Sequence, residues 1–472
     1  MRIDINVNPL LLDEESPLQL TATTLYGLED ILSEELQQLG ATEVEVGRRV
    51  VHFKGTKSLL YRANYFCRTA LRILMPLISF EAQDPDDLYD QCFRYPWHTI
   101  LPPQADFFID TAVFSTIFTN SRYALYRVKD AIRDICAQKG DVAWNATDHR
   151  RNAICIHLHI NEKRVTLSLD SSGESLHHRG YRVGFALAPL NELLAAGILL
   201  KAGYDGSQDL FDPMCGSGTF IAEAAMIASH TPAGYYRDEY AFMRWINFDL
   251  DLWKSIRKEA HLSPIDGRII ARDKDFKAIG TTTATLQKMG FRNDVEILME
   301  DFLKASPPSK KPLLIIMNPP YGRRVRTEDL VQLYQAVGRK LKHEYAGSKV
   351  WIIASPPALF DKLGLACESK EKIYNGELEA QLRSYQLFEG KKNSYKAQQQ
   401  KEEALLHAQA RTVEKSTVRG TQPRKRTRQR DINIAYASTF SSAPIQERRH
   451  TSFRRRGARE IQVFSFEDES KN

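Results

Sequence analysis

An asparagine and two prolines follow a short apolar run in Ile315-Ile316-Met317-Asn318-Pro319-Pro320-Tyr321. Because proline lacks an N–H and restricts its own φ, the pair stiffens the chain and leaves the Pro319 carbonyl without a helical partner. The Asn318 side-chain oxygen and the Pro319 carbonyl oxygen can then accept both N–H groups of one amine. Tyr321 has a ring of the kind that stacks on unstacked bases. The pattern favours chemistry on the exocyclic NH2 of a nucleobase, which needs positioning rather than a strong base.

A second segment of mostly small residues joins an apolar strand to a helix. It reads Asp212-Pro213-Met214-Cys215-Gly216-Ser217-Gly218-Thr219. In a parallel α/β sheet the carboxyl ends of the strands form the ligand crevice. Gly216 and Gly218 have no side chain, so we expect a ligand to approach the backbone closely there. The acid at the strand end suits the cationic methionine part of a sulfonium cofactor, and the sequence lacks the glycine-rich phosphate loop that ends in Gly-Lys-Ser/Thr.

Two further acidic residues follow later strands of the same predicted sheet. Asp273 comes after a strand predicted over 268–271, where an acid holds the ribose hydroxyls of an adenosyl cofactor. A helix N-cap explains Asp273 nearly as well. Asp301 follows a strand predicted over 295–299 and is either an acceptor for an adenine amine or a solvated turn residue.

The elements needed to position these residues follow from the alternation of apolar segments between 190 and 388. Strands alternating with crossover helices indicate a mostly parallel, doubly wound α/β sheet. Strands are predicted over 209–211, 268–271, 295–299, 313–317 and 349–354, helices over 192–202, 219–228, 276–289 and 327–343, and an edge hairpin within 373–388.

The N-terminal half has the pattern of two α+β units. The first is predicted to have strands 18–23, 44–53 and 71–80 with helices 27–39 and 57–68, and the second to have strands 105–114, 153–160 and 164–169 with a helix over 120–138. Along this last helix Tyr123, Tyr126, Val128, Ile132 and Ile135 fall roughly on one face. The basic residues between them either line an RNA surface or form a solvated face; they are Arg122, Arg127, Lys129 and Arg133.

The length of the chain and the distribution of its charge also indicate how it is divided into domains. A chain of 472 residues is long enough for two or three domains. The formal net charge of +6 is uneven, because residues 389–472 contain about nineteen Lys/Arg against about ten Asp/Glu. This basic tail has few periodic apolar positions and is predicted to be disordered. It either adds RNA affinity through counterion release or is a solvated extension.

Several classes of protein are disfavoured. The six cysteines include no CxxC pair, which argues against a disulfide framework and a metal cluster. The N-terminus lacks the pattern of a signal peptide, and no apolar stretch approaches the ~18 residues that span a bilayer. We therefore expect a cytoplasmic protein with no metal and no membrane partner.

These segments together resemble a known family. The run from Asp212 to Thr219, with Asn318 to Gly322, is similar to the cofactor and target-amine motifs of class I amino-methyltransferases. Residues 120–132 resemble the core of a THUMP domain, and residues 176–192 resemble the junction that precedes the catalytic domain in that family. From about Leu18 to Phe388 the chain resembles the guanine-N2 methyltransferase half of the bifunctional bacterial large-subunit rRNA methyltransferases.

The resemblance implies a domain order, a cofactor and a partner. A ferredoxin-like segment at 18–58, a THUMP RNA-binding domain at 59–170 and a linker at 171–189 would precede a Rossmann-like class I methyltransferase domain at 190–388. S-adenosyl-L-methionine is the implied donor, and 23S rRNA, naked or within a pre-50S particle, is the implied partner. The resemblance assigns 212–219, Asp273 and less surely Asp301 to the cofactor, and 318–321 to the amine. It does not give the oligomeric state.

Other functions remain open from the residues alone. The same amine chemistry could act on a guanine of transfer RNA, on adenine N6 of DNA or on a protein amide. A non-catalytic RNA-binding assembly factor with an inert methyltransferase fold is a third class. The preference for guanine N2 over adenine N6 rests on the resemblance.

Overall fold

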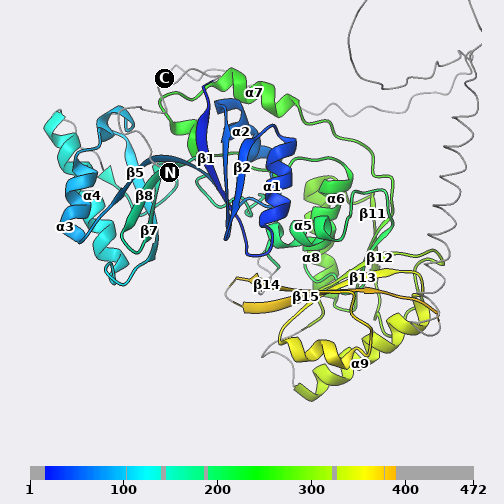
Figure 1. The fold of residues 1–472 in the computed structure, drawn as a ribbon. Helices are drawn as coiled ribbons and strands as arrows, with labels where there is room; N and C mark the ends of the chain where they lie inside the picture. Colours follow the sequence, from blue (N-terminus) through cyan, green and yellow to red (C-terminus); the bar gives the residue numbers. More distant parts are fainter. Residues whose placement is uncertain are drawn as a thin grey trace, which may run out of the picture. The chain divides into compact units, whose positions relative to one another are not determined.

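The computed structural model describes residues 16–102, 104–139, 145–184, 190–320, 327–376 and 378–389, so the basic tail lies outside the described residues. The N-terminal half contains an eight-stranded sheet (Figure 1). Its elements are β1 (Leu18–Thr23), α1 (Glu29–Gln38), β2 (Thr42–Gly47), β3 (Val50–Gly55), α2 (Lys57–Phe66), β4 (Arg72–Glu81), α3 (Pro85–Phe93), β5 (Asp106–Phe114), α4 (Ser121–Lys139), β6 (Asn145–Ala146), β7 (Ile154–Asn161) and β8 (Arg164–Asp170).

The two predicted α+β units share this sheet. Its strand order is β2-β3-β1-β4-β8-β7-β5-β6, so β4 lies between the first unit and the second. The first residues of β4 pair with β1, and the strand pairs along its length with β8, with a register shift between Pro76 and Ile78. The apolar positions of the strands and of α1 to α4 form one continuous core. The two units are therefore joined by β4 rather than by a flexible connection.

Two local predictions for this half are corrected. The single strand predicted over 44–53 is the hairpin of β2 and β3, whose turn places Arg49 at a φ of +61°. Arginine is an unusual residue for a left-handed turn position, so the sequence gives little warning of it. Helix α3 was not predicted, although Asp84 caps it by accepting the N–H groups of Asp86 and Asp87, and Pro85 occupies its first turn.

The buried face of α4 also differs from the prediction. Val128 and Ile132 are fully buried, but Tyr123 and Tyr126 are 49% and 55% exposed. The small residues Ala124 and Ala131 lie in the core in their place. Small side chains permit a close approach of the helix to the sheet, and the larger tyrosines then project to solvent.

The C-terminal half contains the predicted doubly wound sheet, and its α/β class is confirmed. Its strand order is β11-β10-β9-β12-β13-β15-β14, parallel through β13 and closed by an antiparallel hairpin. The elements are α5 (Glu192–Lys201), β9 (Leu210–Asp212), α6 (Thr219–Ala228), α7 (Leu250–Lys258), β10 (Ile269–Asp273), α8 (Phe276–Met289), β11 (Val295–Met299), β12 (Leu314–Met317), α9 (Thr327–Glu344), β13 (Lys349–Ala354), β14 (Ser369–Asn375) and β15 (Leu378–Gln386).

Helices cover both faces of this sheet (Figure 1). Along β12, Leu314 and Ile316 pack in the core that contains α5 and α6, while Ile315 and Met317 pack in the core that contains α9. A strand buried on both faces has no polar alternation, which explains the continuous apolar run in the sequence. No helix in the described part of the chain is both long enough and apolar enough to span a membrane.

The segment predicted as a linker over 171–189 is packed into the molecule where it is described. Arg179 is 1% exposed and donates hydrogen bonds to the carbonyl oxygens of Arg68 and Leu176. Tyr181 donates to Glu223 of α6 at 2.9 Å. Arg182 pairs with Glu192 at the start of α5. Residues 171–184 therefore connect the two halves through buried polar contacts.

An insertion between α6 and β10 makes a second connection between the halves. Its residues Tyr240, Phe242 and Trp253 are buried in the N-terminal core. The Phe242 ring stacks on Tyr61 of α2 with centroids 4.3 Å apart, and Trp253 lies edge-on to Tyr65 at 5.4 Å. Aromatic pairs of this geometry stabilise a fold beyond the area they bury. We call residues 232–260 the aromatic insert.

Replacing Trp253 by alanine should destabilise the protein by about 3–5 kcal/mol, because it leaves a cavity among the rings. Urea unfolding followed by circular dichroism measures the change. Leu250→Ala, on the same helix but 50% exposed, is the matched control and should change the stability by less than about 0.5 kcal/mol. Equal effects of the two substitutions would contradict this role of the insert.

Candidate active site

The predicted functional segments meet at the carboxyl ends of four neighbouring parallel strands. Strand β9 lies between β10 and β12, with Phe211 in register with Ile270 on one side and with Ile315 on the other. Asp212 ends β9, Asp273 ends β10, and Asn318 follows β12 directly. The strand order therefore gathers residues that are far apart in the sequence at one edge of the sheet.

The loop from Asp212 to Thr219 is held by a hydrogen bond within the loop and by two hydrogen bonds to the end of β10. Asp212 accepts the N–H of Met214 at 3.1 Å, and the N–H of Cys215 donates to the Arg272 carbonyl at 2.9 Å. The N–H of Gly216 donates to the Asp273 carboxylate at 2.9 Å. These contacts fix the loop against the end of β10.

The two glycines of this loop serve different purposes. Both have positive φ, +54° at Gly216 and +75° at Gly218. A Cβ at Gly216 would have no heavy atom within 4 Å, so this backbone faces open space. A Cβ at Gly218 would lie 2.7 Å from the side chain of Thr282. The predicted close approach of a ligand fits Gly216, whereas Gly218 is required for the packing of α6 against α8.

Asp273, which ends β10, and Asp301, which follows β11, have different surroundings. Asp273 accepts N–H groups from Gly216 and Asp275, both at 2.9 Å. The N-cap of α8 is Asp275, not Asp273, so the helix-cap explanation for Asp273 does not hold. Asp301 is half-buried and accepts the N–H of Leu303 at 2.9 Å, as a turn residue does. Asp273 thus lies in the site and shapes it.

Asp212 is buried without a cationic partner in the described residues. It is 1% exposed, and burial, assisted by the nearby charge of Asp273, raises its pKa to about 8 although the Met214 N–H opposes the shift. A carboxyl in this position favours a ligand that brings a positive charge, because such a ligand would offset the desolvation of the carboxylate.

One acceptor of the segment predicted to bind the target amine is buried without a partner among the described residues. The Asn318 side-chain oxygen is inaccessible to solvent and has no hydrogen-bond partner within the described part of the chain. Pro319 is buried and Pro320 is exposed beside it. Tyr321 lies outside the described residues, so its predicted stacking role stays a prediction. The hydroxyl of Thr219, at the start of α6, is likewise buried without a partner among the described residues.

The basic residues predicted for RNA on α4 do not form one uniform surface. Arg122 and Arg133 are exposed. Arg127 pairs with Asp86 at 2.8 Å and lies over a tyrosine ring. Lys129 is only 9% exposed and pairs with Asp148 at 3.0 Å. The prediction for Lys129 as an RNA-surface residue therefore does not fit its position.

One residue that shapes the site was missed in the sequence. Thr282 of α8 donates a hydrogen bond to the Gly216 carbonyl at 2.9 Å and fills the space beside Gly218. It lies inside a helix among other threonines, so only the packing of α8 on α6 reveals its role. Among the described residues, no group of three or more His, Cys, Asp or Glu could hold a metal ion.

Three domain families match consecutive parts of the chain. The RlmL ferredoxin-like domain matches residues 19–74, the THUMP domain matches 82–170, and the RMKL-like methyltransferase domain matches 179–384. The chain therefore contains, in this order, a ferredoxin-like domain, a THUMP domain and an RMKL-like methyltransferase domain.

Across these domains the chain is similar to ribosomal RNA large subunit methyltransferase K/L. It is 34% identical over 389 residues to that protein from Syntrophotalea carbinolica, covering 79% of this chain and 54% of the relative. The K/L protein of Cellvibrio japonicus is 34% identical over 379 residues, covering 77% of this chain and 50% of the relative. The chain thus spans about half the length of these relatives.

Solved structures share the fold over most of the chain. A methyltransferase complexed with SAH has a TM-score of 0.71 and 26% identity, covering 80% of this chain and 100% of its own. A protein from Listeria monocytogenes described as an N6-adenine-specific DNA methylase has a TM-score of 0.70 and 27% identity, covering 79% and 97%.

The raised pKa of Asp212 predicts that the difference in stability between the wild type and Asp212→Asn changes with pH. Between about pH 4 and pH 8 the unfolded chain ionises this carboxyl while the folded protein keeps it protonated. The wild type should therefore lose stability relative to the variant as pH rises through this window, by at most about 1.4 kcal/mol per pH unit.

Urea unfolding across this range measures the difference. Asp205→Asn is a matched control, since hydrogen bonds from Ser207 lower the pKa of Asp205. The difference in free energy of unfolding between Asp205→Asn and the wild type should stay flat between about pH 5 and pH 8, where this carboxyl is ionised in both states. A flat difference for Asp212→Asn as well would show that Asp212 is ionised in the folded protein.

Proposed function

We propose that the chain transfers a methyl group from S-adenosylmethionine to N2 of a guanine in large-subunit ribosomal RNA. The observation that carries this proposal is the unsatisfied Asn318 oxygen at the strand end next to the Asp212 and Asp273 loop. This oxygen supports the proposal, because an unpartnered acceptor for an amine at this position would lie beside a cofactor held by the loop. A ribosomal RNA substrate would place the protein in the cytoplasm.

The residues present fit S-adenosylmethionine. The open backbone at Gly216 allows a ligand to lie against the loop, and the buried Asp212 carboxyl would accept hydrogen bonds from its ammonium group. Asp273 would accept hydrogen bonds from the ribose hydroxyls, and Asp301 is the proposed neighbour of the adenine amine. When bound, the cofactor supplies an electrophilic methyl group on a sulfonium. The chain's own contribution is to hold and orient it.

The amine site then acts by orientation. Asn318 Oδ1 and the Pro319 carbonyl would accept the two N–H groups of the target amine, which directs the nitrogen lone pair away from them. The lone pair of an exocyclic amine is delocalised into the ring, and holding both hydrogens favours the pyramidal nitrogen that attacks. Preorganised acceptors of this kind contribute mainly electrostatic stabilisation and positioning. Tyr321 would stack on the target base.

The N-terminal half supports RNA as the substrate. A THUMP domain and K/L relatives whose name states ribosomal RNA both favour it. Arg122 and Arg133 on α4 are exposed and suited to phosphate contacts, and Arg127 would join them on release from Asp86. The RNA would be bound either as deproteinised 23S rRNA or within a pre-50S particle.

Asn318→Ala should lower the rate of methyl transfer to 23S rRNA by about 10²–10³-fold, because it removes an acceptor used in the transition state. Transfer of a tritiated methyl group measures the rate, and equilibrium dialysis should show unchanged cofactor affinity. Asn293→Ala, an exposed residue before the amino end of β11, is the matched control and should retain full activity. An Asn318→Ala protein as active as the wild type would refute the assignment.

Adenine N6 in DNA is the second candidate substrate. It is favoured by the structural similarity to the Listeria protein described as a DNA methylase, and the Asn-Pro-Pro acceptors suit any planar amine. The two candidates are separated by offering the wild type both 23S rRNA and duplex DNA. Methyl transfer to adenine in DNA, with none to RNA, would replace the first proposal by the second.

A further inference from the structure

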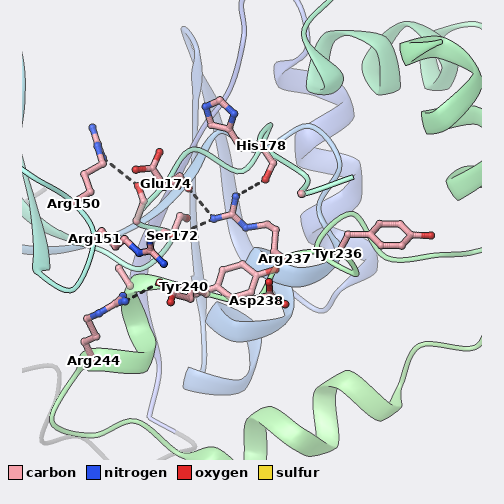
Figure 2. A pocket seen from close by; sticks show the side chains of 14 residues that line it. Arg150, Arg151, Ser172, Glu174, His178, Tyr236, Arg237, Asp238, Tyr240 and Arg244 are labelled. Atoms are coloured by element: carbon pink, nitrogen blue, oxygen red, sulfur yellow. Dashed lines mark hydrogen bonds and ion pairs between the residues drawn. The ribbon is translucent and has the colours of Figure 1, made fainter. Parts of the chain in front are cut away.

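A hollow of about 390 Å³ lies where the two halves of the protein meet, and its lining includes none of the residues proposed for methyl transfer. Its walls come from the residues before β7, from residues 172–180 and from the start of the aromatic insert (Figure 2). Volumes of this size are typical of small-ligand pockets. Its lining includes four arginines, Arg150, Arg151, Arg237 and Arg244, and three carboxylates, Glu174, Asp238 and Glu239.

Arg237 builds the wall of this hollow. It is 8% exposed, and its two terminal nitrogens donate to the carbonyl oxygens of Ser172, Glu174, Ser175 and His178. Its guanidinium also lies over the Tyr240 ring at 5.0 Å. One buried side chain therefore holds residues 172–178 in a fixed curve around the hollow.

Two of the remaining arginines already have anionic partners. Arg150 pairs with Asp110 at 2.6 Å and approaches the buried Asp170 at 3.5 Å. Arg244 pairs with Glu239 at 2.9 Å. Arg151 is exposed and makes no ion pair with any described residue. Figure 2 shows these three arginines on the left side of the hollow, and Arg151 is the one among them whose charge no carboxylate of the described residues offsets through an ion pair.

Two carboxylates of the lining are available as acceptors. Glu174 and Asp238 are exposed, and neither side chain makes a hydrogen bond or an ion pair within the described ranges. A site for a simple polyanion would not place free carboxylates beside its arginine, because they repel phosphate. The arrangement suits a ligand that offers a phosphate to one side and hydroxyl or amine hydrogens to the other.

We propose that this hollow binds a ribonucleotide unit of the substrate RNA, with its phosphate at Arg151 and its 2′-hydroxyl donating to Glu174 or Asp238. This inference rests on the proposed RNA substrate. The 2′-hydroxyl is the group that distinguishes RNA from DNA at a given contact. The hollow would therefore select RNA by chemistry, at a place where residues of both halves are fixed relative to each other.

Fluorescence anisotropy with a labelled single-stranded RNA and the DNA of the same sequence tests the proposal on the full chain. Arg151→Glu should weaken RNA binding about tenfold, because a phosphate contact is replaced by a repulsion. Arg48→Glu, an exposed charge reversal on the β2–β3 turn at the far edge of the sheet, should weaken it less than about twofold. Equal weakening by the two variants would overturn the proposal.

The carboxylate contact has its own test. Glu174→Gln combined with Asp238→Asn should lower the ratio of the DNA to the RNA dissociation constant by about threefold or more. The reason is that an amide oxygen accepts a hydrogen bond from the 2′-hydroxyl less strongly than a carboxylate does. Glu34→Gln, exposed on α1, is the control and should leave the preference unchanged. An unchanged preference in the double variant would also overturn the proposal.

Methyl transfer by the wild type, measured in parallel, tests the proposed function separately. If the wild type methylates no RNA, but the hollow variants still lose RNA binding or RNA preference as predicted, the proposed reaction is refuted and the hollow is retained. An active wild type whose Michaelis constant for 23S rRNA is equal to that of Arg151→Glu would refute the hollow and keep the reaction.

Discussion

The hydrogen bond from the Gly216 N–H to the Asp273 carboxylate is the contact on which the candidate site depends. It joins the loop after β9 to the end of β10, and Thr282 secures the same glycine through its carbonyl. A glycine held at both its N–H and its C=O keeps a fixed conformation while its α-carbon faces open space. The proposed cofactor contacts at Asp212 and Asp273 both require this geometry.

The contacts between the two halves impose a second constraint on function. Residues 171–184 and the aromatic insert pack buried side chains across the boundary, including Arg179, Tyr181 and Trp253. A large target such as ribosomal RNA would be held by one half and modified in the other. Rigid contacts of this kind would keep the distance between binding and chemistry constant, which favours one nucleotide over its neighbours.

Much of the fold and of the site's location could be predicted, because strands buried on both faces have continuous apolar runs and end at the functional residues. The rest depends on packing that no local pattern encodes. Tyr123 and Tyr126 match the helical period of α4 but are displaced from the core by alanines. Gly218 resembles Gly216 in the sequence, and only the position of Thr282 separates their roles. Residues 171–184 contain the glycines of a linker, yet their arginines find buried partners.

The central claim is that the Asn318 site methylates one guanine of large-subunit ribosomal RNA. Mass mapping of 23S rRNA from a strain that lacks this protein, beside its parent, tests the claim most directly. The account predicts that a single guanine loses one methyl group in the deletion strain and regains it with the wild-type protein but not with Asn318→Ala. A 23S rRNA with an unchanged methylation pattern would contradict the account.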